Sequence, residues 1–143
     1  MNLSKLKKLI VLSGCPDSGK STILKELCKI VDSSPLMTAK DPKEQEVANV
    51  DQRYAATFKG RKLAIVTGGD DADAIVKAFM YADKVQATIL VMALSIHSRG
   101  YRTSEKAFDL VVSSFNLTPD KSTKTQQNSH MDLKVANALY KKI

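Results

Sequence analysis

The sequence predicts an α/β domain in which a mostly parallel sheet carries helices on both faces and a β-hairpin at one edge. Three observations lead to this fold class. Short apolar runs that are typical of buried strands alternate along the chain with segments whose apolar residues recur at helical spacing. One run, residues 87–94, contains no charged residue and suits an interior parallel strand. Two further β-rich runs flank Lys59 and Gly60, a pattern typical of an antiparallel hairpin.

Length and composition favour a single compact domain that spans residues 1–143. Apolar residues make up 43% of the chain and charged residues 26%, which are ordinary values for a globular protein. No apolar run approaches the roughly 18 residues of a membrane-spanning segment, and the N-terminal run is too short for a signal peptide. We therefore expect a cytoplasmic protein with no membrane partner, in which Cys15 and Cys28 are both reduced.

The first strand is predicted over residues 9–12 and the first helix over residues 22–31. The residues expected on the core side of this helix recur at helical spacing: Leu24, Leu27, Cys28 and Val31. Residues 36–50 are polar and mixed, and they predict no regular element. The hairpin is expected from residues 54–58 and 61–67, and its second strand is expected at the centre of the sheet.

A helix is predicted over residues 72–83, with a core face that follows i, i+3, i+4, i+7 spacing: Ile75, Ala78, Phe79 and Ala82. After the strand at residues 87–94, a helix over residues 104–116 is expected to bury four residues: Phe108, Val111, Val112 and Phe115. Residues 121–127 fit either an exposed edge strand or a loop. Ser129 and Asp132 form a capping-box-like pattern that opens a last helix. One side of that helix is expected to face the core: Leu133, Ala136, Tyr140 and Ile143.

A motif of the form G-x-x-x-x-G-K-[ST] lies between the first strand and the first helix. It consists of Gly14, Cys15, Pro16, Asp17, Ser18, Gly19, Lys20 and Ser21, and Thr22 follows it. Gly14 and Gly19 are expected to allow backbone angles that let successive N–H groups converge on phosphate oxygens. The Lys20 ammonium would reach the β- and γ-phosphates, and the Ser21 hydroxyl would bind Mg²⁺.

On this motif the chain resembles the P-loop NTPase superfamily, and it is most similar to small kinases that act on nucleosides or nucleotides. The resemblance implies a three-layer P-loop fold, a bound nucleoside triphosphate and Mg²⁺. The Asn-Lys-x-Asp signature by which many GTPases recognise guanine does not occur, which favours ATP. The specific resemblance covers about ten residues, and the α/β pattern around it is compatible with the superfamily.

The acid that usually assists the metal in this superfamily would stand at the end of a second apolar strand, where this chain has Thr67. The nearest acids are Asp70 and Asp71, which follow Gly68 and Gly69. Either acid is a candidate metal ligand together with Ser21. Either acid is equally a candidate cap for the helix that begins at Ala72.

Two arginines, Arg99 and Arg102, follow the strand at residues 87–94. Guanidinium groups at the carboxyl end of a strand suit the γ-phosphate or a phosphorylated acceptor, so both are candidate catalytic residues together with Lys20 and Asp70. The alternative is ordinary surface charge, because exposed ion pairs and isolated surface arginines are common.

Two functions fit these residues. The first is a kinase-like phosphotransferase that moves phosphate from ATP to a nucleotide or another small-molecule acceptor. The second is an ATP-binding regulatory or partner-binding module with weak or no hydrolysis, which the unusual acid favours. The net charge of +7 is compatible with a nucleic-acid partner. The basic residues are nevertheless dispersed along the chain, which favours a solvated surface over a nucleic-acid face.

Overall fold

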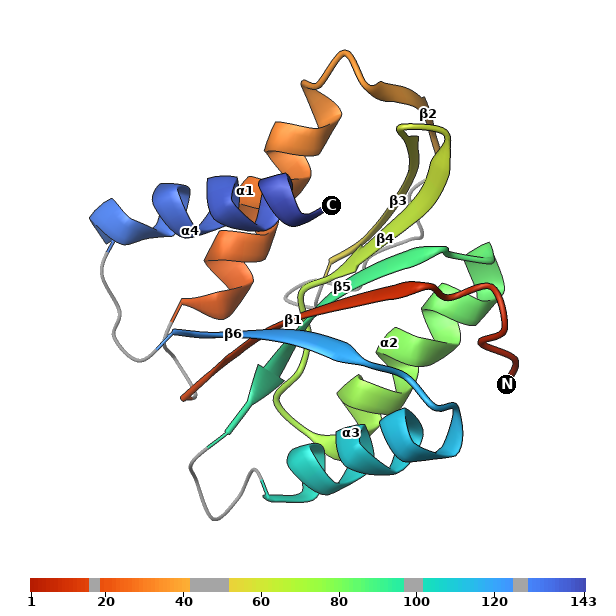
Figure 1. Cartoon of the computed structure of the whole chain (residues 1–143). Coiled ribbons are helices and arrows are strands. Elements are labelled where there is room, and N and C mark those ends of the chain that lie inside the picture. Colours follow the sequence, from red (N-terminus) through yellow and green to blue (C-terminus); the bar gives the residue numbers. More distant parts are fainter. Residues whose placement is uncertain (16–18, 42–51, 97–101, 125–128) are drawn as a thin grey trace.

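A six-stranded sheet with the strand order β2-β3-β4-β5-β1-β6 runs through the domain (Figure 1). The computed structural model describes residues 1–15, 19–41, 52–96, 102–124 and 129–143. The strands are β1 (Lys8–Gly14), β2 (Met37–Lys40), β3 (Arg53–Phe58), β4 (Arg61–Val66), β5 (Ile89–Ser95) and β6 (Pro119–Lys124). β1 pairs in parallel with β5 and β6, and β4 pairs in parallel with β5. β3 pairs antiparallel with β4 and with β2. The predicted mostly parallel sheet and its hairpin are confirmed, but β2, rather than the hairpin, forms the edge of the sheet.

Four helices cover both faces of this sheet in the described part of the chain: α1 (Lys20–Asp32), α2 (Ala72–Val85), α3 (Arg102–Ser114) and α4 (Ser129–Lys142). Figure 1 shows α1 and α4 on one face and α2 and α3 on the other. Successive residues of a strand point to opposite faces, so Ile10 packs with the α1 and α4 cluster while Val11 packs with the α2 and α3 cluster. Both residues are fully buried, as expected for an interior strand covered on both faces.

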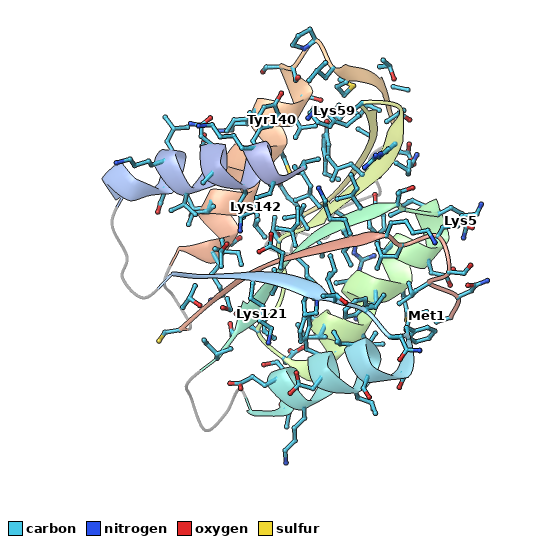
Figure 2. The ribbon with its side chains drawn as sticks, viewed as in Figure 1. Met1, Lys5, Lys59, Lys121, Tyr140 and Lys142 are labelled. Atoms are coloured by element: carbon cyan, nitrogen blue, oxygen red, sulfur yellow. The ribbon has the colours of Figure 1, made fainter. Side chains whose placement is uncertain are left out.

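The last turns of α4 bring it against α1 and the hairpin (Figure 2). Its Tyr140 ring meets the Phe58 ring edge to face at a centroid distance of 5.6 Å, and its hydroxyl lies 2.8 Å from the Ser34 hydroxyl. Leu133 was expected on the core side of α4, but 54% of it is exposed. The rest of the predicted face is confirmed, since Ala136 and Ile143 are buried and Tyr140 packs against the same core. Asp132 and Leu139 are also buried, although the predicted face did not include them.

Two edge strands differ from the expectation. β2 lies within the segment that predicted no regular element, and three of its four residues are exposed. Of the two alternatives for residues 121–127, β6 bears out the edge strand, but it begins at Pro119, ahead of the expected start. Proline is tolerated at the first residue of an edge strand. Residues 125–127 of the predicted strand lie outside the described residues.

The helices that the structure describes are too short or too polar to cross a lipid bilayer.

Candidate functional site

Three segments that the sequence singled out meet at one edge of the sheet. Gly14 ends β1, Ser95 ends β5, and these two residues are direct partners in the parallel β1–β5 ladder. Residues 67–70 follow β4 on the other side of β5. The carboxyl ends of parallel strands are where open α/β sheets bind ligands, so this edge is the candidate site.

The predicted phosphate-binding motif, whose pattern is known as Walker A, begins at Gly14, the last residue of β1, and ends at Ser21 in the first turn of α1. Gly19 adopts φ 90°, a left-handed conformation that glycine takes without strain, and it is the N-cap residue of α1. Gly14 was also expected to need unusual angles, but it is an ordinary strand residue and has no positive φ. No side chain of the described residues caps α1, and its first turn holds no acid. The helix therefore presents backbone N–H donors to the motif, a favourable arrangement for an anion.

Lys20 is the first residue of α1 and is 5% exposed. Its ammonium donates a hydrogen bond to the carbonyl oxygen of Cys15 at 2.8 Å, so the side chain points back toward the start of the motif. Ser21 is half-buried and Thr22 is exposed in the same first turn. A buried ammonium is stable only where hydrogen-bond acceptors replace water, and the Cys15 carbonyl is such an acceptor. The positive charge of Lys20 is therefore held beside the first residues of the motif.

A close contact between two backbones brings the turn after β4 against β5. A Cβ atom on Gly69 would lie 2.1 Å from the backbone oxygen of Ala93, so only glycine fits without a shift of the main chain. The Ser95 N–H donates to the Gly69 carbonyl at 3.0 Å. Next to this contact, the Ser95 hydroxyl donates to a carboxylate oxygen of Asp70 at 2.6 Å. Asp70 thus lies beside the end of β5. This places it one strand away from β1, because β5 lies between β4 and β1.

The two acids after β4 have different roles in the structure. Asp71 is the N-cap of α2, and its carboxylate accepts a hydrogen bond from the Ala74 N–H at 2.7 Å. Asp70 makes the contact with Ser95 instead. Thr67, at the position where a metal-assisting acid was sought, accepts a hydrogen bond from the Gln52 N–H at 2.8 Å and so joins β4 to the start of β3.

Replacing Asp71, the cap of α2, should lower the stability of the protein more than it changes the candidate site. Asp71→Ala is expected to lower the free energy of unfolding by about 1 kcal/mol, because the Ala74 N–H loses its acceptor at a helix N-terminus. Asp71→Asn is the matched control, since its amide oxygen still accepts that bond. Urea denaturation of the two variants measures the difference, and equal stabilities for Ala and wild type would refute the capping role.

A cleft of about 440 Å³ runs between α1 and the β2–β3 side of the sheet, and it begins next to the motif at Thr22. Its polar wall is ordered by Asp32, whose carboxylate lies 3.1 Å from the Lys40 ammonium and accepts a hydrogen bond from the Tyr54 hydroxyl at 3.2 Å. Burial, and then the negative charge of Asp32, raise the pKa of the Tyr54 hydroxyl. The cleft therefore offers an aromatic ring and charges of both signs within reach of a small molecule.

Cys28 also lines this cleft, and burial followed by the nearby Asp32 charge raises the pKa of its thiol from 9.0 to about 12. At pH 8 only about one Cys28 in 10,000 is a thiolate, the reactive form. Iodoacetamide at pH 8 is therefore expected to modify Cys15, which is half-buried, well before Cys28. Mass spectrometry of wild type, Cys15→Ser and Cys28→Ser checks this order. Faster labelling of Cys28 in the folded protein would contradict it.

The same shift has a consequence for stability at high pH. The folded state keeps the Cys28 proton up to about pH 12, whereas the unfolded chain loses it near pH 9.0. The unfolded state then binds fewer protons than the folded state, so the contribution of Cys28 to stability is complete below pH 9 and is lost as the pH rises toward 12.

Several sequence-predicted site residues lie outside the described residues: Pro16, Asp17, Ser18 and Arg99. Arg102 is the first residue of α3, and the structure describes its backbone but not its side chain. Among the described residues, no group of three or more His, Cys, Asp and Glu side chains is arranged to hold a metal ion. Sequence reasoning missed the contact of Ser95 with Asp70, and it missed the cleft. Ser95 could have been found as the polar residue that closes the longest apolar run.

Comparison of the chain with models of known protein families found no match, and comparison with curated proteins found none either.

Proposed function

We propose that the protein binds ATP with Mg²⁺ and transfers its γ-phosphate to a small acceptor. The observation that carries the proposal is the position of the unsubstituted Walker A motif between β1 and α1. There the buried Lys20 ammonium bonds to the Cys15 carbonyl, and no side chain of the described residues caps α1. These are the donors that a triphosphate requires. Chance matches of the motif seldom occur in this structural context.

The donor set at the same edge suits Mg²⁺. The Ser21 hydroxyl and the Asp70 carboxylate are oxygen ligands, which Mg²⁺ prefers, and Mg²⁺ usually keeps several waters and needs few protein ligands. Bound Mg²⁺ would neutralise charge that develops on the phosphates. Lys20 would hold the β- and γ-phosphates, and Arg99 and Arg102 are the proposed partners of the γ-phosphate or the acceptor.

The cleft beside Thr22 favours transfer over simple binding, since its volume of about 440 Å³ is that of a small-molecule site. The acceptor hydroxyl oxygen would form a bond to the γ-phosphorus while the bond to the bridging oxygen breaks. The products are ADP, a phosphorylated acceptor and one proton released to water. ATP, Mg²⁺ and reduced cysteines are all compatible with the cytoplasm, which we propose as the location.

The test has two parts, binding and transfer. Fluorescent ATP should bind in a Mg²⁺-dependent manner, and MgATP should protect Cys15 from iodoacetamide because Cys15 lies in the loop. Radiolabelled ATP is then incubated with nucleosides, nucleotides and small alcohols. Transfer to a subset of these supports the proposal, and ATP binding without transfer to any of them refutes the kinase function.

One observation favours the second candidate, an ATP-dependent regulatory module. β5, the strand next to β1, ends in Ser95 rather than in an acid, and Asp70 is already hydrogen-bonded to that serine. Such a module would bind ATP but hydrolyse it slowly until a partner binds. Rapid turnover by the purified protein alone would exclude it.

A nucleic-acid partner is less favoured. The labelled lysines Lys5, Lys59, Lys121 and Lys142 lie over different parts of the molecule in Figure 2. Nucleic-acid faces gather their positive charge on one side. Salt-dependent binding of the purified protein to DNA or RNA would support a nucleic-acid partner after all.

A further inference from the structure

Ser95 joins three segments of the chain at the candidate site. It is fully buried, and each of its polar groups has a partner. Its N–H donates to the Gly69 carbonyl at 3.0 Å, and its hydroxyl donates to Asp70 at 2.6 Å. Its carbonyl oxygen accepts a hydrogen bond from the Ser104 hydroxyl of α3 at 3.1 Å. Gly14, the first residue of the Walker A motif, is its partner in the β1–β5 ladder.

The hydroxyl at position 95 is an exception in its strand. The other residues of β5 are apolar and buried, and a buried hydroxyl is costly unless it is hydrogen-bonded. Asp70 supplies the acceptor, and 2.6 Å is the short distance of a bond from a hydroxyl to a charged carboxylate. The bond uses one of the several acceptor positions of the carboxylate, so Asp70, which is exposed, keeps capacity for a further ligand.

Helix capping does not account for Asp70, because Asp71 already caps α2. Nor does the strand order bring Asp70 to the motif, since β5 separates β4 from β1. The Gly69 contact and the Ser95 hydroxyl are what hold this acid at the end of β5, opposite Gly14.

We propose that Ser95 is a positioning residue that holds Asp70 as the Mg²⁺-directed acid of the site. An acid from the turn after β4 thereby takes the place of one that β5 itself lacks. This inference rests on the proposed function, because it assumes that MgATP binds at the motif.

The test compares two buried serines. Ser95→Ala removes the bond to Asp70, and Ser104→Ala removes a hydroxyl that is equally buried but leaves that bond intact. The readout is the Mg²⁺ concentration that gives half-maximal binding of fluorescent ATP, with thermal unfolding of each variant alongside. Ser95→Ala should raise that concentration about tenfold, the usual effect of losing a partner that orients a metal ligand. Ser104→Ala should leave it unchanged.

The Asp70→Asn variant distinguishes the loss of the acid's negative charge from the loss of its hydrogen bond to Ser95. Its amide oxygen still accepts the Ser95 bond but has no charge, so the Mg²⁺ requirement should rise at least as much as in Ser95→Ala. Combining Asp70→Asn with Ser95→Ala should add little further change. Equal Mg²⁺ requirements for Ser95→Ala and Ser104→Ala, or a wild-type requirement in Asp70→Asn, would overturn the inference.

The outcomes also separate this inference from the proposed function. If wild type binds no ATP at any Mg²⁺ concentration, the proposed function fails. If wild type binds MgATP and the variants share its Mg²⁺ dependence, only the role of Ser95 fails. Should Ser95→Ala not fold, a wild-type Mg²⁺ requirement in Asp70→Asn would still overturn the inference, since the Asp70 side chain is exposed and its hydrogen bond is kept.

Discussion

Lys20→Met should weaken the binding of MgATP at least about 100-fold, a loss of about 3 kcal/mol. Methionine keeps the buried, unbranched stem of the side chain and removes only the ammonium. The proposed triphosphate then loses its one buried cationic partner from α1. Truncation of one member of a desolvated charge pair typically has an effect of this size. Titration with fluorescent ATP at constant Mg²⁺ measures the change.

Lys25→Met is the matched control for this variant. Lys25 lies one turn further along α1, is exposed and has no ion pair with another described residue. Its replacement removes the same charge from the same helix, and MgATP affinity should change less than about threefold, the effect of screened surface charge. Equal losses in the two variants would mean that the net charge of the protein, rather than the position of Lys20, determines binding. Thermal unfolding confirms that both variants are folded.

Gly69→Ala is expected to destabilise the domain by about 3 kcal/mol, the upper range for overpacking of a buried site. The new Cβ atom would meet the backbone oxygen of Ala93, which cannot move without disturbing β5. Relief of the clash has to shift the turn after β4, and with it Asp70. The variant should therefore lose both stability and Mg²⁺-dependent ATP binding, as measured by urea denaturation and by titration.

Asp71→Ala provides the comparison, since Asp71 lies in the same turn but points its carboxylate at the start of α2. It should lose about 1 kcal/mol of stability and keep its Mg²⁺ dependence. A Gly69→Ala protein as stable as wild type would show that β4 and β5 are not in tight backbone contact at this point.

The spacing of apolar residues along the sequence accounts for most of what could be predicted about the fold. The buried residues of α2 recur at helical spacing in the sequence, and the charge-free run of β5 is buried along its whole length. β2 could not be predicted in this way, because a short edge strand with three exposed residues has no apolar pattern. The limits of the buried face of α4 also escaped prediction, since Leu133 and Leu139 both fit a helical stripe but only Leu139 is buried in the structure.

The candidate site was predictable where local sequence determines it. The Walker A motif is contiguous, so its turn between β1 and α1 follows from spacing alone. The relation of Asp70 to Ser95 joins positions 25 residues apart and depends on β5 lying between β4 and β1. Strand order is a tertiary property, so the sequence left the roles of Asp70 and Asp71 open. The cleft likewise joins α1 to β3, which are separated by residues with no predicted element.

The bond between the Lys20 ammonium and the Cys15 carbonyl orders this side chain within the protein itself. An ammonium carries three donor hydrogens, so an anion could bind it without displacing the carbonyl. A lysine side chain loses up to about 2 kcal/mol of rotamer freedom when it is held in one conformation, and here folding rather than ligand binding accounts for that loss. The lysine is thus preorganised, and an anion that binds it would meet a side chain whose conformation is already set.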